Sequence, residues 1–177
     1  YNPLGMGDTI DILNLLALIR TQAGSAGPLE KADGKHIALW GHSMGGGIVL
    51  RALEIDQDID AAVLYASINA DEKINLQYFA TEDGRGRTIM QISDEVLHSL
   101  SPSTYLDRLS SPLSIHYGGK DTVVPKEWSE QLCKNLGTLQ KEVDCYYYAD
   151  QAHTFQNDGD TLFIQRTIEF FEQKLKR

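Results

Sequence analysis

The chain has 177 residues, of which 42% are hydrophobic and 23% charged, and this composition is typical of one compact globular domain. A net charge of −9 argues against a nucleic-acid-binding surface, because such surfaces bind phosphates through Lys and Arg. The sequence contains neither an apolar stretch of about 20 residues, which a membrane helix needs, nor a signal-peptide pattern. We therefore expect a soluble protein; its compartment stays open, with the cytoplasm slightly favoured.

Stretches with helical and with strand-like patterns alternate along the chain. The first predicted helix is capped by Asp8 and has apolar residues at helical spacing as far as Ile19. Four strands are predicted, over residues 36–40, 61–66, 113–117 and 143–148. Further helices are predicted over 44–55 and 126–136, and the last one carries an apolar stripe of Ile164, Ile168, Phe171 and Leu175. This alternation predicts the α/β class, with a mostly parallel sheet and helices on both faces.

A polar stretch between the second and third predicted strands, residues 67–111, is too long for a simple connection. We expect it to form a lid-like insertion within a single domain that spans residues 1–177. Four apolar side chains in it are candidates for the wall of a substrate pocket, and packing beneath the lid would explain them equally well. They are Leu76, Tyr78, Phe79 and Met90.

The two cysteines, Cys133 and Cys145, match neither a zinc site nor a disulfide-dense secreted scaffold. Two free thiols and one disulfide both fit this pattern. The sequence implies no metal site and no organic cofactor.

The strongest signal is the run Gly41-His42-Ser43-Met44-Gly45, which lies between a predicted strand and a predicted helix. G-x-S-x-G in this context is typical of a nucleophile elbow, a sharp turn that exposes the serine hydroxyl at the carboxyl edge of a sheet. The glycines on either side are expected to prevent collisions between strand and helix. The backbone N–H of Met44 would donate a hydrogen bond to the oxyanion that forms when Ser43 attacks a carbonyl.

A serine hydroxyl needs a base to take its proton and a carboxylate to hold that base in the right tautomer. Asp121 follows the third predicted strand and His153 follows the fourth, so both are expected at the same sheet edge as Ser43. Asp150 is nearer to His153 in sequence, but the imidazole must be approached from an adjacent loop, and Asp121 is preferred. His42 is given no catalytic role, because its position usually packs or shapes the pocket floor.

These motifs resemble the α/β-hydrolase superfamily, and more narrowly its dienelactone-hydrolase-like and prolyl-oligopeptidase-like branch. The resemblance rests on the block from Ile37 to Gly46, the segment from Ser101 to Leu106, and the loops that carry Asp121 and His153. It implies an α/β-hydrolase fold in which Ser43, Asp121 and His153 are nucleophile, acid and base.

One departure from the family concerns the beginning of the chain. In the family, earlier strands precede the helix that here begins near Asp8, and a loop among them donates the second hydrogen bond to the oxyanion. The sequence therefore predicts an α/β-hydrolase fold that lacks its N-terminal strands. Three accounts stay open: a fragment of a longer chain, which we prefer, completion by a second chain, or a minimal hydrolase whose oxyanion site is built from Tyr1 to Met6.

The function predicted from these residues is hydrolysis of a small-molecule carboxylic ester through a covalent acyl-enzyme, by Ser43 with His153 and Asp121. A serine peptidase of the prolyl-oligopeptidase type shares the motifs and is the alternative within the same chemistry. Such peptidases usually carry an additional N-terminal domain that restricts substrate size, so we favour the esterase. A third hypothesis is a truncated, non-catalytic module that binds a ligand or a partner chain.

Overall fold

The structure of the chain is a computed structural model, which describes residues 4–79 and 92–175. A parallel sheet lies at its centre, in the order β1-β2-β3-β4. The strands are β1 (Ala38–His42), β2 (Ala61–Tyr65), β3 (Leu113–Gly118) and β4 (Val143–Tyr148). Because all the strands are parallel, their carboxyl ends and the loops that follow them meet at one edge of the sheet.

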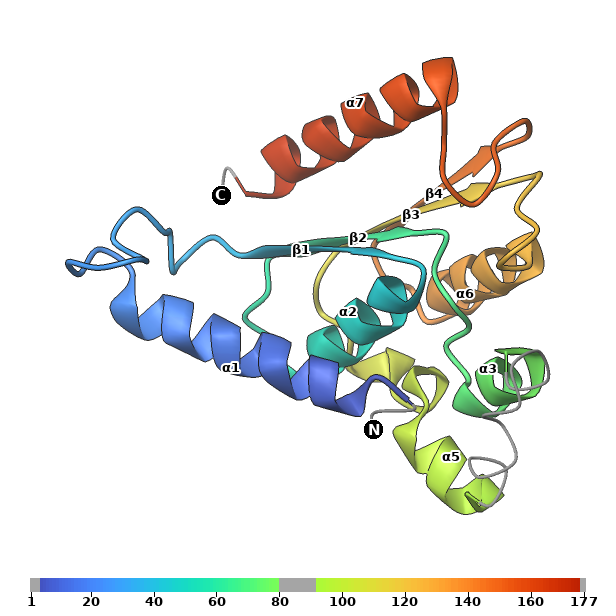
Figure 1. Ribbon diagram of the computed structural model, residues 1–177, viewed down its shortest axis with the longest axis horizontal. Helices are drawn as coiled ribbons and strands as arrows, with labels where there is room; N and C mark the ends of the chain where they lie inside the picture. The colour runs from blue at the N-terminus through green and yellow to red at the C-terminus, as the bar shows by residue number, and fades with distance from the viewer. Residues whose placement is uncertain (1–3, 80–91, 176–177) are drawn as a thin grey trace.

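Helices cover both faces of this sheet (Figure 1). One face is covered by α7 (Asn157–Lys174), and the other by α1 (Met6–Gln22), α2 (Met44–Ile55) and α6 (Lys126–Thr138). The predicted mostly parallel sheet with helices on both faces is therefore confirmed. None of the helices that the structure describes combines the length and the apolar character needed to cross a bilayer.

The long segment between β2 and β3 is partly helical. Its described part forms α3 (Glu72–Phe79), α5 (Asp94–Leu100) and two short 3-10 helices, Pro102–Thr104 and Leu106–Arg108. α3 packs against α5, and the first 3-10 helix packs against α2. Leu76 of α3 is buried with Leu4 and Leu97 in a small apolar cluster, while Met90 lies outside the described residues. That this segment acts as a lid stays a prediction.

The core lies on the two faces of β2, which is buried along its whole length. Side chains alternate between the faces of a strand, so Ala62 and Leu64 pack with α2, while Val63 and Tyr65 pack with aromatic residues of α7. This double burial explains why β2 reads as a continuous apolar run rather than an alternating one.

The apolar stripe that identified the last helix in the sequence is only partly on the side that α7 buries: Phe171 packs against the core, and the two isoleucines do not. Ile164 and Ile168 are 47% and 53% exposed, whereas Phe163 and Phe170 are buried. The ring of Phe163 lies 4.5 Å from that of Tyr65, centroid to centroid. Phenylalanine buries a large apolar area, so the aromatic side of α7 faces the sheet.

The first helix begins three residues earlier than predicted. Its N-cap is Gly5, at φ 64°, a left-handed conformation that glycine adopts without strain. A Cβ at this position would lie 3.4 Å from Ile48, so the start of α1 sits close to α2. Asp8 falls in the first turn, where its charge favours the positive end of the helix dipole, and does not cap the helix.

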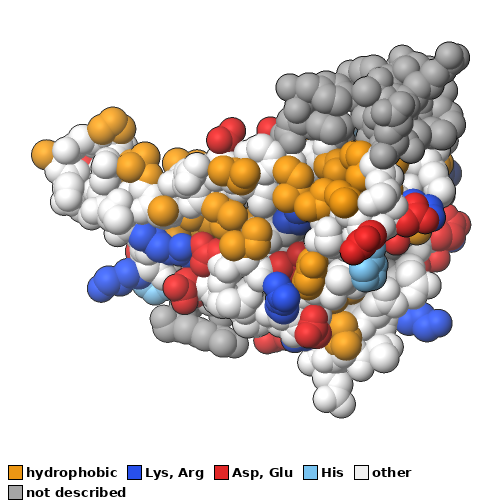
Figure 2. Space-filling model, turned by 90° about the horizontal axis from the view of Figure 1, so that it is seen from below, with side chains coloured by type: hydrophobic (Ala, Val, Ile, Leu, Met, Phe, Trp, Pro, Cys, Tyr) orange, Lys and Arg blue, Asp and Glu red, His pale blue; other side chains and the backbone are white. Residues whose placement is uncertain are grey.

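The outer side of α1 carries exposed apolar residues. Leu16 is buried toward α2, whereas Ile10, Leu15 and Leu18 are between 43% and 55% exposed. Figure 2 shows the molecule from this side, with hydrophobic side chains gathered in a band across the face. A surface helix of a globular protein usually carries polar residues on its outer side, so α1 departs from that pattern.

The two cysteines form a disulfide between Cys133 on α6 and Cys145 on β4. The sequence is compatible with two free thiols or one disulfide, because the spacing of two cysteines does not indicate which elements pack together. The disulfide ties α6 to the edge strand of the sheet.

A buried histidine, His116 on β3, lies beneath α7. Its Nδ1 lies 2.9 Å from the Tyr148 hydroxyl, and its Nε2 lies 2.9 Å from the Ser114 hydroxyl. The imidazole stacks on Tyr146, and the Arg166 guanidinium lies 4.3 Å from the centroid of that tyrosine ring. Burial, together with the charge of Arg166, lowers the pKa of His116 from 6.5 to about 3. The folded protein therefore keeps this imidazole neutral.

We expect His116 to weaken folding in mild acid. The unfolded chain binds a proton here near pH 6.5, while the folded chain stays neutral down to about pH 3. In this window the unfolded state binds more protons, so the free energy of unfolding decreases as the pH is lowered, by up to about 1.4 kcal/mol per pH unit. In the variant His116→Gln, which can keep both hydrogen bonds, we expect a flatter profile. Urea unfolding of both proteins at pH 7, 6 and 5 measures the difference, and parallel profiles would refute it.

Candidate active site

Ser43 occupies the turn between β1 and α2, in the strand–turn–helix context that the motif predicts. Its φ of 56° and ψ of −120° lie in a region that residues other than glycine rarely adopt. The turn is held by β2 and the loop after it: the Ser43 N–H donates to the Tyr65 carbonyl at 2.9 Å, and the Ser43 carbonyl accepts from the Ile68 N–H at 3.1 Å. These bonds maintain the unusual backbone conformation of Ser43.

Close packing around this turn depends on two of its glycines. A Cβ at Gly41 would collide with the backbone of Gly45, and a Cβ at Gly46 would collide with the Ser67 side chain. A Cβ at Gly45 would meet no atom within 4 Å. The expectation that the glycines on both sides of Ser43 prevent collisions is therefore correct for Gly41 and wrong for Gly45.

His153 and Asp121 lie side by side on the loops that follow β4 and β3. The His153 Nδ1 is 2.8 Å from the Asp121 Oδ2, and the two side chains are 17% and 3% exposed. The Asp121 Oδ1 accepts hydrogen bonds from the N–H groups of Val123 at 2.8 Å and Val124 at 2.9 Å. The carboxylate is thus fixed by its own loop. A proton shared at Nδ1 leaves the Nε2 of His153 as the nitrogen that can accept a proton.

Asp150, the alternative acid, lies in a different environment. It forms an ion pair with Lys120 at 2.7 Å, in which the two side chains are 82% and 65% exposed. The hydrogen bond from Lys120 and its charge lower the pKa of Asp150. Of the two carboxylates, the structure brings Asp121 to His153.

His42, for which no catalytic role was predicted, lies between the Ser43 turn and His153. Its Nε2–H donates to the backbone carbonyl of His153 at 3.0 Å. Its ring lies 4.6 Å from the His153 ring and is stacked at 4.4 Å on Tyr65, centroid to centroid. This contact links the residue next to Ser43 with the loop of His153, so both loops meet at the same end of the sheet.

Met44 is the first residue of α2, so its N–H is one of the amides that have no partner within the helix. These amides form the positive end of the helix dipole and lie next to Ser43. This is the placement that a donor to an oxyanion requires. Of the segment considered for a second donor, residues 1–3 lie outside the described residues, and Leu4 is buried.

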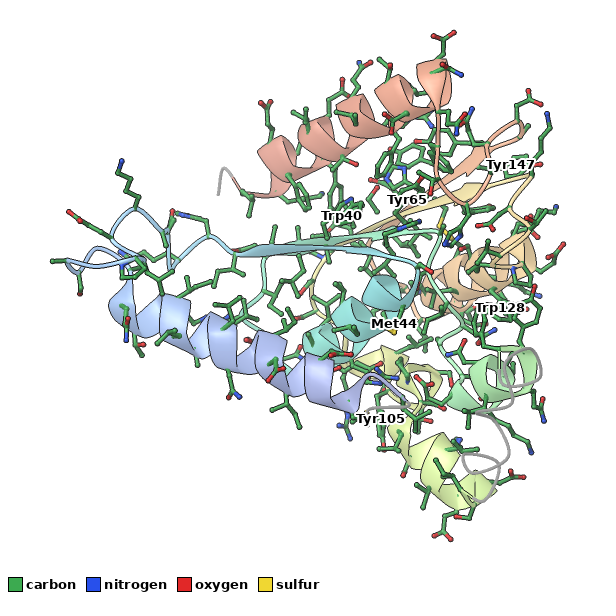
Figure 3. The ribbon with its side chains drawn as sticks, in the orientation of Figure 1. Trp40, Met44, Tyr65, Tyr105, Trp128 and Tyr147 are labelled. Atoms are coloured by element: carbon green, nitrogen blue, oxygen red, sulfur yellow. A yellow bond between two sulfur atoms is a disulfide. The ribbon has the colours of Figure 1, made fainter. Side chains whose placement is uncertain are left out.

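An aromatic cluster joins α3 to the beginning of α6. The ring of Trp128 lies 5.0 Å from that of Tyr78 and 5.9 Å from that of Phe79, centroid to centroid. Tyr78 is 42% exposed, so the cluster is open to solvent. In Figure 3, Trp128 lies on the same side of the sheet as Met44. Trp128 was not predicted; its signal was an aromatic residue in the first turn of the helix that follows the Asp121 loop.

Solved structures share this fold. A puromycin-hydrolyzing peptidase of Mycobacterium tuberculosis superposes on 96% of the chain with a TM-score of 0.79 and 22% identity. The acylaminoacyl peptidase of Pyrococcus horikoshii superposes on 98% of the chain with a TM-score of 0.79 and 23% identity. A Klebsiella pneumoniae protein provisionally described as a dienelactone hydrolase superposes on 93% of the chain with a TM-score of 0.66 and 17% identity. The chain spans 25%, 28% and 62% of these three chains.

Sequence comparison gives the family. No curated protein matches the chain at the required significance. The model of the dienelactone hydrolase family matches residues 20–175, a range that includes Ser43, Asp121 and His153. Together with the four parallel strands and the helices on both faces, this match shows that the chain belongs to the dienelactone hydrolase family, in the α/β-hydrolase superfamily.

Proposed function

We propose that the chain carries a serine-hydrolase site that cleaves small carboxylic esters, with Ser43 as nucleophile, His153 as base and Asp121 as acid. The observation that supports this most is the His153 imidazole, held at 2.8 Å by a nearly buried carboxylate beside the strained Ser43 turn. A fixed carboxylate, an oriented imidazole and a serine on a sharp turn are the parts that acyl transfer requires.

The proposed reaction proceeds in two halves. The Ser43 hydroxyl attacks the carbonyl carbon of the ester while the Nε2 of His153 takes its proton, and the Met44 N–H stabilises the oxyanion. Collapse of the intermediate breaks the ester bond, and His153 gives its proton to the leaving alcohol. A water molecule, deprotonated by His153, then attacks the acyl carbon; the bond from that carbon to the Ser43 oxygen breaks, His153 returns the proton to Ser43, and the carboxylic acid leaves. Asp121 stays ionised and stabilises the imidazolium in both halves.

The aromatic cluster of α3 and α6 is evidence that the substrate carries an apolar group. Tyr78, Phe79 and Trp128 present ring faces and edges that can bury an acyl chain or an aromatic leaving group. We propose that these rings contact the substrate. This assigns a function to two of the side chains predicted for the pocket and adds Trp128.

A serine peptidase is the second candidate, and the superposition on two peptidases favours it. Ester and amide hydrolysis use the same triad chemistry, and the two differ mainly in the leaving group, since an amine must be protonated before it departs. Substrate preference therefore distinguishes the two candidates.

We expect the purified chain to hydrolyse p-nitrophenyl butyrate with a kcat/KM at least about tenfold above that for acetyl-alanyl p-nitroanilide, because kcat/KM measures which transition state the site stabilises. Release of p-nitrophenol or p-nitroaniline is followed by absorbance over a series of substrate concentrations. A higher kcat/KM for the anilide would assign the chain to the peptidases. Turnover of neither substrate would favour the non-catalytic module.

A further inference from the structure

The backbone of the His153 loop is held on both sides of the histidine. The carbonyl of His153 accepts a hydrogen bond from the Nε2–H of His42 at 3.0 Å. Two residues further, the N–H of Phe155 donates to the hydroxyl of Tyr65. Asp121 orients the imidazole ring, whereas these two bonds act on the main chain that carries it.

His42 and Tyr65 form one unit within the sheet. They are the last residues of β1 and β2 and are direct partners in the register of the two strands. Their rings stack at 4.4 Å, and Tyr65 is only 5% exposed. The Tyr65 ring is further enclosed by Phe155 at 4.6 Å and Phe163 at 4.5 Å. The His42 imidazole, which donates to the loop, and the Tyr65 hydroxyl, which accepts from it, therefore both lie at strand ends whose positions the packed core fixes.

From this arrangement we infer that His42 and Tyr65 are positioning residues, which set the distance of His153 from Ser43 by holding the loop main chain on both sides of the base. The inference rests on the proposed function of the site. Asp121 can rotate the ring into line, but it cannot fix how far the loop stands from the elbow. A displacement of about 1 Å at a reacting group can cost on the order of a hundredfold in rate, so this hold has a measurable consequence.

Tyr148 provides a matched control for Tyr65. Both tyrosines end a strand, and both are buried, with Tyr148 6% and Tyr65 5% exposed. Both belong to the same aromatic cluster with Phe155. The Tyr148 hydroxyl lies 2.9 Å from His116 in the core, whereas the Tyr65 hydroxyl bonds to the loop of His153. Loss of the Tyr148 hydroxyl removes its bonds to His116 and Arg166, whereas loss of the Tyr65 hydroxyl removes a bond to the loop of His153.

The first test compares Tyr65→Phe with Tyr148→Phe in the full chain. We expect Tyr65→Phe to lower kcat for p-nitrophenyl butyrate about tenfold with KM changed less than about twofold, because positioning acts on the transition state. We expect Tyr148→Phe to leave kcat within about twofold. Its midpoint of urea unfolding is expected to fall at least as much as that of Tyr65→Phe. Equal kcat values for the two variants would overturn the inference.

The second test uses the donor on the other side of the base. In His42→Gln the side-chain amide can still donate to the His153 carbonyl, whereas in His42→Leu it cannot. We expect the glutamine variant to keep most of the kcat that the leucine variant loses, with a loss of about tenfold in the latter. Equal losses in both would show that packing, and not the hydrogen bond, is what His42 contributes, and would overturn its part of the inference.

A third measurement does not depend on turnover. Amide hydrogen exchange of Phe155, followed by NMR, is expected to accelerate by about tenfold or more in Tyr65→Phe and to stay unchanged in Tyr148→Phe, because only Tyr65 accepts a bond from this N–H. Unchanged exchange in both variants would overturn the inference even if the wild type is active. If the wild type shows no turnover that depends on Ser43, the proposed function fails, while the exchange rates still decide whether Tyr65 holds the loop.

Discussion

Replacing Ser43 by alanine is expected to abolish hydrolysis of p-nitrophenyl butyrate, with kcat lowered on the order of 10⁶-fold, the scale of loss when the nucleophile of a triad is removed. The variant retains the turn, the helix N-terminus and the His153–Asp121 pair, so what it loses is formation of the acyl-enzyme. The residual rate is the one that binding and the oxyanion donor support without a nucleophile. Initial rates at saturating substrate measure the effect.

The control for this variant is folding. Alanine keeps a Cβ at φ 56°, as serine does, so the backbone strain of the turn is unchanged and the midpoint of urea unfolding is expected to match that of the wild type. A Ser43→Ala protein that unfolds normally and still hydrolyses the ester at the wild-type rate would place the nucleophile elsewhere.

The second large effect is expected for Asp121→Asn, with kcat lowered on the order of 10⁴-fold, because the amide stabilises the wrong tautomer of the base. In the structure the Asp121 Oδ2 accepts from the His153 Nδ1. An asparagine NH₂ group at this place would donate to Nδ1 instead, and the proton would move to Nε2, where it prevents His153 from accepting one from Ser43.

Asp150→Asn is the matched control, since it makes the same chemical change three residues from His153. Asp150 is exposed and paired with Lys120, so its loss is expected to change kcat by less than about twofold. A pH–rate profile of each variant completes the comparison. Comparable losses in both variants would contradict the assignment of Asp121, and a large loss in Asp150→Asn alone would reverse it.

The parts of the fold that sequence could predict are those specified by local patterns. α2 and β4 have the predicted bounds, residues 44–55 and 143–148, because an apolar run after a glycine turn and an apolar run before a loop each carry their own signal. β1 begins at Ala38 instead of residue 36. The Asp33 carboxylate accepts hydrogen bonds from the N–H groups of Lys35 and His36 and holds these residues in a turn.

Contacts across the sheet could not be predicted in the same way. His42 and Tyr65 are 23 residues apart and meet only because β1 and β2 pair in one particular register, and a shift of one residue would place them on opposite faces. The same holds for Cys133 and Cys145, which are joined because α6 packs on β4. In each case a single sequence shows the residue types but not which neighbours tertiary packing gives them.

The choice of the buried side of α7 shows a competition that periodicity alone does not resolve. The helix has apolar residues on two sides, and the stripe with Ile164 and Ile168 has the more regular spacing. The sheet, however, presents the rings of Tyr65 and His116, and Phe163 packs against both, at 4.5 and 4.9 Å. Aromatic packing therefore determines the orientation of the helix.

The central claim is that Ser43 is a nucleophile activated by His153. The most direct test is to incubate the full chain with a serine-directed fluorophosphonate, measure the intact mass, and locate the adduct by peptide mapping. The account predicts one adduct per chain, on the peptide that contains Ser43, with labelling absent in Ser43→Ala and strongly slowed in Asp121→Asn. Absence of an adduct in the wild type, or an adduct on another serine that persists in Ser43→Ala, would contradict it.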